Sequence, residues 1–272
     1  MPELPEVETI VRGLAETLPG ARIRRVEVLH ANLIADEPPA SFARALRGRT
    51  IASVTRRAKN IVMPLDGGER LLVNLGMTGR LFVARRGDPL PSHPGVRLEL
   101  DGGRTLLYHD VRRFGRLWRM SDEAWRTWEA TLGVEPLSDA FTPERLGALA
   151  ARSRVAVKTW LMDQKRVVGV GNIYASEALF RARIDPRRPA DSLAPAEVRR
   201  LRDAVQEVLR ESIAFRGTTL LDYRDAGGEP GEFVKRLRVY DRAGEPCLVC
   251  GKTVHRIVQG GRSTFFCEHC QN

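Results

Sequence analysis

Four cysteines near the C-terminal end have a spacing that indicates a definite chemistry. They form two Cys-x2-Cys pairs separated by sixteen residues, namely Cys247, Cys250, Cys267 and Cys270. Two such pairs around an insert of hairpin length are typical of zinc ribbons, in which four thiolates surround one Zn²⁺ tetrahedrally. The alternatives are two disulfides or four free thiols, and both fit this spacing less well in a chain without a secretion signal. Because four cysteines leave no coordination position for water, we expect one structural zinc ion.

The first residues of the chain could supply a nucleophile. Removal of Met1 would leave Pro2 with a free α-amine, and we expect that removal because the second side chain is small. An α-amine has a reference pKa of about 8, against about 10.4 for lysine, so far more of it is unprotonated at pH 7. Such an amine can form a Schiff base with a sugar aldehyde. The neighbouring Glu3 could then exchange a proton with the sugar ring oxygen.

The same residues also have a simpler interpretation. A proline in the first turn and an acid near the positive end both favour the start of a helix, which would explain Pro5 and Glu6 without any chemistry. The first six residues by themselves leave both interpretations open. In either case we expect an amphipathic helix over residues 5–18, because apolar residues follow at helical spacing: Val7, Ile10, Val11, Leu14 and Leu18.

Length and charge narrow the class of protein. The 272 residues are enough for two domains, and 43% hydrophobic residues argue against a disordered chain. Lys and Arg number 44 against 34 Asp and Glu, which gives a net charge of +10 that attracts polyanions. A general arginine preference of the source would give the same excess. Residues 152–188 nevertheless hold nine basic and three acidic residues, six of the ten net charges, so we expect nucleic acid to bind there.

No stretch approaches the roughly 18 uncharged apolar residues of a membrane helix. The chain also starts with acidic residues rather than with a basic and then apolar signal segment. We therefore expect a cytoplasmic protein.

Short apolar runs predict a β-sandwich after the first helix. The predicted strands cover residues 22–29, 51–54, 71–75, 81–84, 97–100 and 105–108. Two Asp-Gly-Gly sequences, at residues 66–68 and 101–103, are typical of hairpin turns.

After about residue 121 the pattern predicts helices. They cover residues 122–132, 143–151, 155–163, 173–182 and 195–214. The proline-containing segment 133–143 is the expected boundary between two lobes, and residues 225–231 are an expected loop or mobile lid.

Six sequence blocks carry a resemblance to a known family. They are MPELPEVETI at the start, RRAKN at 56–60, NLGMTG at 74–79, DVRRFGR at 110–116, VKTWLMDQKRVVGVGNIYASEALF at 157–180, and the terminal CLVC and CEHC. In this order, and over almost the whole chain, they resemble the bacterial formamidopyrimidine-DNA glycosylases.

The resemblance implies an α+β fold with two lobes. It implies a catalytic domain over residues 1–132, a helix–two-turn–helix domain with a lesion-covering loop over 133–234, and a four-cysteine zinc finger over 235–272. The implied activity is removal of 8-oxoguanine opposite cytosine and of formamidopyrimidines from double-stranded DNA, followed by strand cleavage through β and δ elimination. A monomer is expected.

Four residues take catalytic roles by the same resemblance. Pro2 attacks C1′ of the flipped nucleotide, and Glu3 protonates the sugar ring oxygen. Glu6 helps to position the active site, and Lys59 lies near the phosphate and base of the damaged nucleotide.

Extrusion of the damaged base leaves a void in the duplex that side chains must fill. By the resemblance Met77, Arg112 and Phe114 fill it, with Arg112 offering donors to the orphaned cytosine. Met77 and Phe114 could instead be core residues, but both lie in turn-like sequences rich in glycine, which favours exposed positions.

The resemblance also implies contacts to the DNA backbone. The implied contacts come from His93, Lys158, Asn172, Tyr240 and Arg262. Asn172 follows Gly169-Val170-Gly171 at an expected helix start, where backbone N–H groups can receive a phosphate. Many family members have a second histidine two residues after the first, whereas this chain has Gly95 there. The lesion-covering loop corresponds to residues 217–233.

Two other functions remain to be compared. An endonuclease VIII-like enzyme for oxidised pyrimidines typically opens with MPEGPE instead. A non-catalytic protein that binds damaged DNA could use the same basic region and zinc ribbon, but it would have no need for a free α-amine on Pro2.

Overall fold

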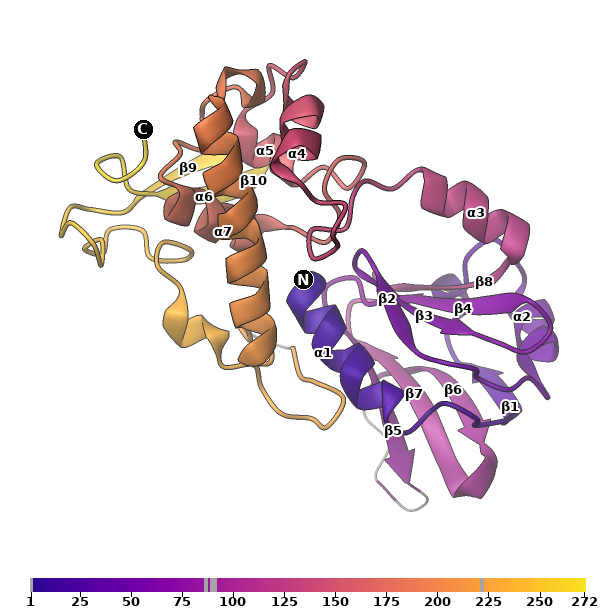
Figure 1. The fold of residues 1–272 in the computed structure, drawn as a ribbon. Helices are drawn as coiled ribbons and strands as arrows, with labels where there is room; N and C mark the ends of the chain where they lie inside the picture. Colours follow the sequence, from indigo (N-terminus) through magenta and orange to yellow (C-terminus); the bar gives the residue numbers. More distant parts are fainter. Residues whose placement is uncertain (1, 86–87, 89–91, 221–222) are drawn as a thin grey trace. The chain divides into compact units, whose positions relative to one another are not determined.

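The computed structural model describes residues 2–85, 88, 92–220 and 223–272 (Figure 1). The chain divides into two compact units, which are described one at a time. The first comprises Met1–Ala130 and Phe215–Glu232, and the second comprises Thr131–Ala214 and Phe233–Asn272. Residues 215–232, which the sequence analysis assigns to the second domain, thus pack with the first unit.

The first unit begins with helix α1, Leu4–Ala15. Pro5 lies in its first turn, where a missing N–H costs nothing, and its apolar stripe is buried, including Val7, Ile10 and Leu14. The stripe joins the main core, so α1 is anchored against the sandwich by burial of apolar surface.

Two antiparallel four-stranded sheets form the sandwich of the first unit (Figure 1). One sheet has the order β1-β6-β7-β5, with β1 Ile23–Val28, β5 Gly79–Arg85, β6 Pro94–Leu100 and β7 Arg104–Asp110. The other has the order β2-β3-β4-β8, with β2 Thr55–Arg57, β3 Asn60–Pro64, β4 Glu69–Asn74 and β8 Arg116–Ser121. Their inward side chains share one core with α1, so both sheets and the helix form a single folding unit.

Most predicted strands of this unit are confirmed, with one error. Residues 51–54 do not form a strand, because Ile51 makes only an isolated bridge to Leu65 and the strand β2 begins later. The sequence pattern does not predict β3, β8 or helix α2, Pro39–Leu46. The first Asp-Gly-Gly turn joins β3 to β4, and the second is a 3-10 turn that joins β6 to β7. Helix α3, Asp122–Ala130, closes the N-terminal part of the unit.

The second unit is helical and ends in a β-hairpin. Its helices are α4 Pro143–Ala150, α5 Val157–Leu161, α6 Asn172–Ala182 and α7 Pro195–Ala214. The hairpin strands are β9 His255–Gln259 and β10 Arg262–Phe266. The predicted apolar face of α7 is confirmed, since Leu201, Val205 and Val208 are buried. Only α5 is clearly shorter than the predicted span of 155–163.

The C-terminal segment is attached to α6 by a small core of its own. Phe180 of α6 packs with Val254, Phe265 and two of the cysteines. The side chain of Gln271 adds a hydrogen bond to the carbonyl of Ile184, just after α6. The position of the cysteine-bearing segment is therefore set by α6.

Among the described residues, no helix combines the length and the apolar character needed to cross a membrane.

Candidate functional site

The start of α1 holds the predicted catalytic carboxylates in a reciprocal capping box. The amide of Glu3 donates to Oε2 of Glu6 at 2.8 Å, and the side chain of Glu3 accepts from the backbone of Glu6. Only 3% of Glu3 and 1% of Glu6 is exposed, and Pro2 is buried. The two carboxylates therefore have fixed positions beside Pro2, at the positive end of the helix.

Glu6 also binds the segment that returns from the second unit. Its other oxygen, Oε1, accepts from the amide of Thr218 at 2.7 Å. The hydroxyl of Tyr223 donates to the backbone carbonyl of Glu6 at 3.3 Å. Gly217 has a φ of +83° and lies so close that a Cβ there would be 2.8 Å from Oε1 of Glu6. The expected lesion-covering loop is thus fastened at its base to α1.

Lys59 lies in the two-residue turn between β2 and β3. Residue Ala58 of this turn has a φ of +56°, and its carbonyl accepts from Arg56 at 2.9 Å. Arg56 in turn pairs with Glu8 of α1 at 3.0 Å. The turn that carries Lys59 is therefore linked to the helix that carries Glu3 and Glu6.

Met77, Arg112 and Phe114 project from two loops that touch. Met77 is 41% and Phe114 is 54% exposed, so the core interpretation of both residues is wrong. The Arg112 guanidinium lies 4.6 Å from the centre of the Phe114 ring. A Cβ on Gly76 would come within 2.5 Å of the amide of Gly115, which shows how closely the two loops approach.

A buried carboxylate connects these two loops. Asp110, 2% exposed, accepts from the Thr78 hydroxyl at 2.6 Å and from the Gly115 amide at 2.8 Å. The Tyr108 hydroxyl donates to the same carboxylate at 3.1 Å. The sequence analysis did not single out Asp110. A signal was present, because Asp110 follows Leu106 and Tyr108 on the inward face of β7.

His93 lies beside a second histidine that the sequence analysis also missed. The rings of His93 and His109 are 6.0 Å apart and meet edge to face. Burial, together with the nearby charge of Arg80, lowers the pKa of His109. At Gly95, where the resemblance would place a second histidine, a Cβ would lie 2.4 Å from Cδ1 of Leu33. A side chain at this position would therefore require the Leu33 side chain to move.

In the second unit, a buried lysine joins three elements. Lys158 of α5 is 1% exposed, and its Nζ donates to Oδ1 of Asn172 at 2.5 Å and to the carbonyl of Ser263 at 3.4 Å. Asn172 begins α6, and Ser263 follows the exposed Arg262 on β10. The structure therefore brings Lys158, Asn172 and the hairpin together, and the Lys158 side chain lies buried beneath the surface.

Tyr240 is held by a buried carboxylate of α6. Glu177 accepts from the amides of Arg238, Val239 and Tyr240 at 2.9–3.0 Å. Burial raises the pKa of Glu177, and the three amides oppose that rise. The Tyr240 ring packs edge to face on Phe265 of β10, 5.0 Å between centres. Tyr240 is thus connected through Glu177 to α6, which begins at Asn172, and through Phe265 to β10, which carries Arg262.

The four cysteines meet as the sequence predicts. Their sulfur atoms all lie within 4.8 Å of one another, with 3.9 Å between Cys247 and Cys270 and 3.5 Å between Cys250 and Cys267. A tetrahedral zinc with bonds of about 2.3 Å requires sulfur separations of about 3.8 Å, so the geometry fits this ion.

The thiols differ in how readily they ionise. Burial and the neighbouring Cys250 raise the pKa of Cys270. Burial opposes ionisation of Cys247 too, but the amides of Val249 and Cys250 lower its pKa to about 7. Ionisation of all four thiols would place four negative charges within 4.8 Å of one another, which a bound cation would balance.

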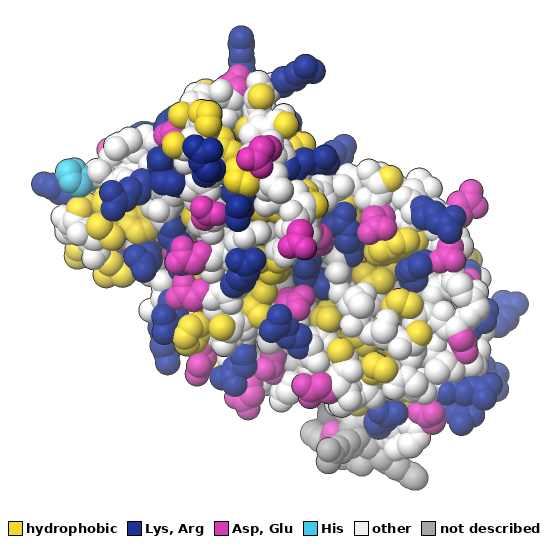
Figure 2. Space-filling view, viewed as in Figure 1, with side chains coloured by type: hydrophobic (Ala, Val, Ile, Leu, Met, Phe, Trp, Pro, Cys, Tyr) yellow, Lys and Arg dark blue, Asp and Glu magenta, His cyan; other side chains and the backbone are white. Residues whose placement is uncertain are grey.

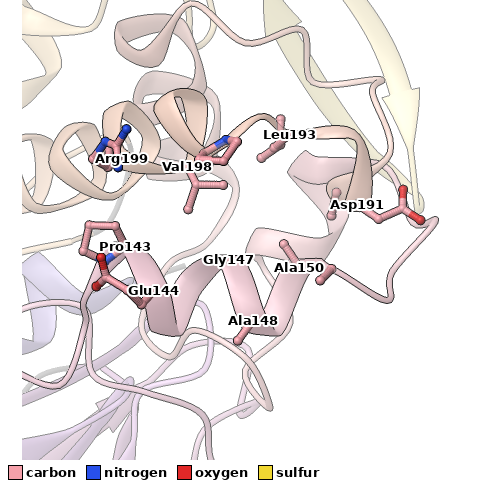
Figure 3. Close-up of a pocket in the computed structure, with 12 residues that line it drawn as sticks. Pro143, Glu144, Gly147, Ala148, Ala150, Asp191, Leu193, Val198 and Arg199 are labelled. Atoms are coloured by element: carbon pink, nitrogen blue, oxygen red, sulfur yellow. The ribbon is translucent and has the colours of Figure 1, made fainter.

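Two surface features lie outside these groups. Figure 2 shows basic and acidic side chains intermixed over the face in view, rather than one continuous basic area. A cavity of about 430 Å³ lies in the second unit, between α4 and the start of α7. Figure 3 shows residues that line it. Its walls include small residues such as Gly147 and Ala150, and none of the predicted site residues lines it.

Comparisons with known proteins match both units. The family model described as the formamidopyrimidine-DNA glycosylase N-terminal domain matches residues 1–117, and the corresponding H2TH domain matches residues 132–223. The model of the zinc finger found in FPG and IleRS matches residues 244–272. With the fold and the sites described above, these matches define a DNA glycosylase with a zinc-finger domain.

Formamidopyrimidine-DNA glycosylases of Methylococcus capsulatus and Xanthomonas euvesicatoria are 46% and 47% identical to the chain, with all of each sequence covered. The chain belongs to the formamidopyrimidine-DNA glycosylase family and is an enzyme of base excision repair.

Solved structures agree with this assignment. The MutM (FPG) protein of Thermus thermophilus is 43% identical, with a TM-score of 0.89 over 99% of this chain and 98% of that chain. A Lactococcus lactis FPG mutant in complex with DNA that contains Fapy-dG is 29% identical, with a TM-score of 0.93 over 99% of both chains. The expected α+β fold with a C-terminal zinc-finger hairpin is confirmed.

Proposed function

We propose that this chain removes 8-oxoguanine opposite cytosine and formamidopyrimidines from double-stranded DNA and then cuts the strand as an AP lyase. The observation that carries the proposal is the capping box that fixes Glu3 and Glu6 beside Pro2. A related protein of Lactococcus lactis has been crystallised with DNA containing Fapy-dG, and also with DNA containing an abasic site. DNA is the partner that these relatives share, and a place at the bacterial nucleoid suits it.

The proposed chemistry begins at Pro2 once Met1 has been removed. The proline nitrogen forms a bond to C1′ of the flipped nucleotide, and the bond between C1′ and the damaged base breaks, with the electron pair leaving on the base. The proton of the proline N–H passes to the departing base. Glu3 donates a proton to the sugar ring oxygen, which opens the ring and gives an iminium ion on Pro2. Loss of the 3′ and then the 5′ phosphate by β and δ elimination cuts the strand, and water releases Pro2.

The remaining predicted residues bind and position DNA in this proposal. Met77, Arg112 and Phe114 fill the void in the duplex, and Lys59 and His93 bind the damaged strand. Asn172, Tyr240 and Arg262 contact backbone phosphates, and Lys158 keeps Asn172 and the hairpin in place from behind the surface.

Covalent trapping tests the chemistry. Borohydride should reduce the Schiff base and leave the protein attached to a duplex containing 8-oxoguanine opposite cytosine. Mass spectrometry of the trapped species should place the DNA on Pro2 and show that Met1 is absent. An active preparation that retains Met1, or a wild-type protein that is not trapped, would reject the Schiff-base route. Preferential trapping on an oxidised pyrimidine would favour the endonuclease VIII-like alternative.

One structural zinc ion completes the proposal, and its removal is the second test. We expect about one Zn²⁺ per chain, bound by Cys247, Cys250, Cys267 and Cys270. Chelation should release the hairpin from α6, because the small core that joins them includes two of these cysteines. DNA affinity should then fall at least tenfold, since about 1.4 kcal/mol of lost contact energy is enough for that change. Far-UV circular dichroism should still report the β-sandwich, which shares no core residue with the cysteines.

A further inference from the structure

The position of Asp110 in its strand is unusual for a charged residue. In β7 alternate residues face the core, and Leu106 and Tyr108 are fully buried there. Asp110 continues that series at the last residue of the strand and is 2% exposed. A carboxylate in such a place is costly to bury unless it accepts several hydrogen bonds. An apolar residue would fit the alternating pattern of β7 at the position of Asp110.

The hydrogen bonds of Asp110 reach both loops that carry the proposed void-filling residues. Its Oδ1 accepts from Thr78, which directly follows Met77. Its Oδ2 accepts from the amide of Gly115, which directly follows Phe114. One carboxylate therefore spans the two loops, with one oxygen on each.

Thr78 extends the link to the third void-filling residue. Its hydroxyl oxygen accepts from the amide of Arg112 at 3.0 Å while its proton goes to Asp110. The adjoining Tyr108 hydroxyl lies 3.4 Å from the carbonyl of Asn74, at the start of the first loop. Burial, and next the Asp110 charge, raises the pKa of Tyr108, so the hydroxyl keeps its proton and stays a donor. The backbones next to Met77, Arg112 and Phe114 are thereby all linked to the buried Asp110 carboxylate, either directly or through the Thr78 hydroxyl.

We propose that Asp110 is a positioning residue that holds Met77, Arg112 and Phe114 ready to enter the duplex; this inference rests on the proposed function. These three side chains form the wedge that enters the duplex. If the wedge were flexible, it would lose conformational entropy on insertion, and that loss would oppose extrusion of the base. Preorganisation by Asp110 removes that cost before DNA binds. Asp110 itself touches neither the sugar nor the base in this account, so its effect depends on whether there is a void to fill.

The test compares a substrate that has a void with one that does not. Thr78→Val removes the hydroxyl that links Asp110 to Arg112, and Thr78→Ser is the matched control that keeps it. Asp110→Asn is the second variant. On a duplex with 8-oxoguanine opposite cytosine, Thr78→Val and Asp110→Asn should lose about tenfold to a hundredfold in single-turnover excision, the size expected for a lost charged hydrogen bond. On an abasic site in single-stranded DNA, where nothing has to be filled, borohydride trapping should match that of the wild type.

Three results would overturn the proposal. An equal loss of reaction on the duplex and on the single-stranded abasic site would mean that Asp110 has a general structural role. An unchanged excision rate on the duplex would mean that the link between Asp110 and the loops does not contribute to excision. Phe114→Ala combined with Asp110→Asn should cost less than the sum of the two single changes, because both act through the same wedge. Additive losses would also contradict the inference.

A fluorescence measurement separates this inference from the proposed chemistry. 2-Aminopurine placed next to the lesion reports unstacking by the wedge without any covalent step. Wild type and Thr78→Ser should raise its fluorescence, and Thr78→Val should not. If the wild type unstacks the base and Thr78→Val does not, but the wild type is never trapped, the proposed chemistry fails while the role of Asp110 stands. If all variants unstack the base equally, the role of Asp110 fails.

Discussion

Glu6 shows how much a single side chain can fix. Its two carboxylate oxygens have different partners, the amide of Glu3 at one and the amide of Thr218 at the other. A carboxylate can accept both bonds, whereas an amide side chain must direct an NH2 group toward one of the two donors. A glutamine, which has the same shape as Glu6, therefore cannot accept both hydrogen bonds at this position.

Glu6→Gln should lower both stability and activity. We expect a loss of about 1–3 kcal/mol in the free energy of unfolding, from one unsatisfied buried N–H. Trapping on the 8-oxoguanine duplex should slow as well, because either the amide of Glu3 or the amide of Thr218 loses its acceptor. Urea unfolding and single-turnover trapping measure the two effects. Glu16→Gln is the control, since Glu16 is an exposed carboxylate at the C-terminal end of the same helix.

His109 should make stability depend on pH. Burial, with Arg80 and His93 nearby, lowers the pKa of His109, and the adjacent Asp110 only partly offsets this. The unfolded chain therefore takes up a proton near pH 6.5 that the folded protein does not bind, so the free energy of unfolding falls as the pH drops below that value. Urea unfolding at about pH 7.5 and about pH 5.5 should show a smaller fall for His109→Gln than for the wild type. An equal fall in both, with His30→Gln as the reference, would argue against this assignment.

Individual site residues differed in how far the sequence could predict them. The four cysteines were predictable because metal geometry restricts their spacing. The roles of Met77 and Phe114 needed the resemblance, but a glycine next to each residue in a turn-like sequence indicated its exposure, and the structure confirms that exposure. Asp110 could have been suspected from its place after Leu106 and Tyr108 on the inward face of β7, but its bond to Thr78 joins residues 32 positions apart. Glu177 accepts from backbone amides 61 to 63 residues away, for which a linear pattern gives no sign.

At the scale of elements, the loop Phe215–Glu232 gives a sharp test of close packing. Gly217 and Gly228 both have positive φ, at +83° and +90°. A Cβ at Gly217 would meet Oε1 of Glu6 at 2.8 Å, whereas at Gly228 nothing lies within 4 Å. The pair therefore separates backbone strain from contact with Glu6.

Gly217→Ala should be the more damaging of the two changes. Gly228→Ala should cost only the backbone strain, about 1–2 kcal/mol. Gly217→Ala should add displacement of Glu6 and reduce trapping as well as stability. Thermal unfolding and trapping of both variants check this, and equal effects would mean that the contact with Glu6 carries no weight.

Sequence patterns predicted elements well where burial is one-sided. Helices α1 and α7 each have an apolar stripe, so their period is readable. Strand β3 is buried at Asn60, Ile61, Val62 and Met63 alike, so it shows no alternation. The run 51–54 looked like a strand because apolar residues flank two small ones, but only Ile51 pairs there.

At the scale of the whole molecule, net charge should determine how DNA binding responds to salt. With about five contacts between Lys or Arg and phosphates, log K should fall with log salt at a slope of about −4 to −5. Arg262→Gln should reduce the slope by about 1, because Arg262 is exposed at the hairpin and is a proposed phosphate contact. Arg25→Gln, on an exposed arginine paired with Glu99, should leave it unchanged. A binding constant that does not respond to salt would contradict the proposed contacts.

The return of Phe215–Glu232 to the first unit has a consequence for dividing the molecule. The polypeptide passes from one unit to the other three times, after Ala130, Ala214 and Glu232. A single proteolytic nick after Ala130 would yield two fragments, of which the C-terminal one still carries the strip that hydrogen-bonds to Glu6. The nicked halves should therefore co-purify, and separately expressed halves should reassemble by complementation.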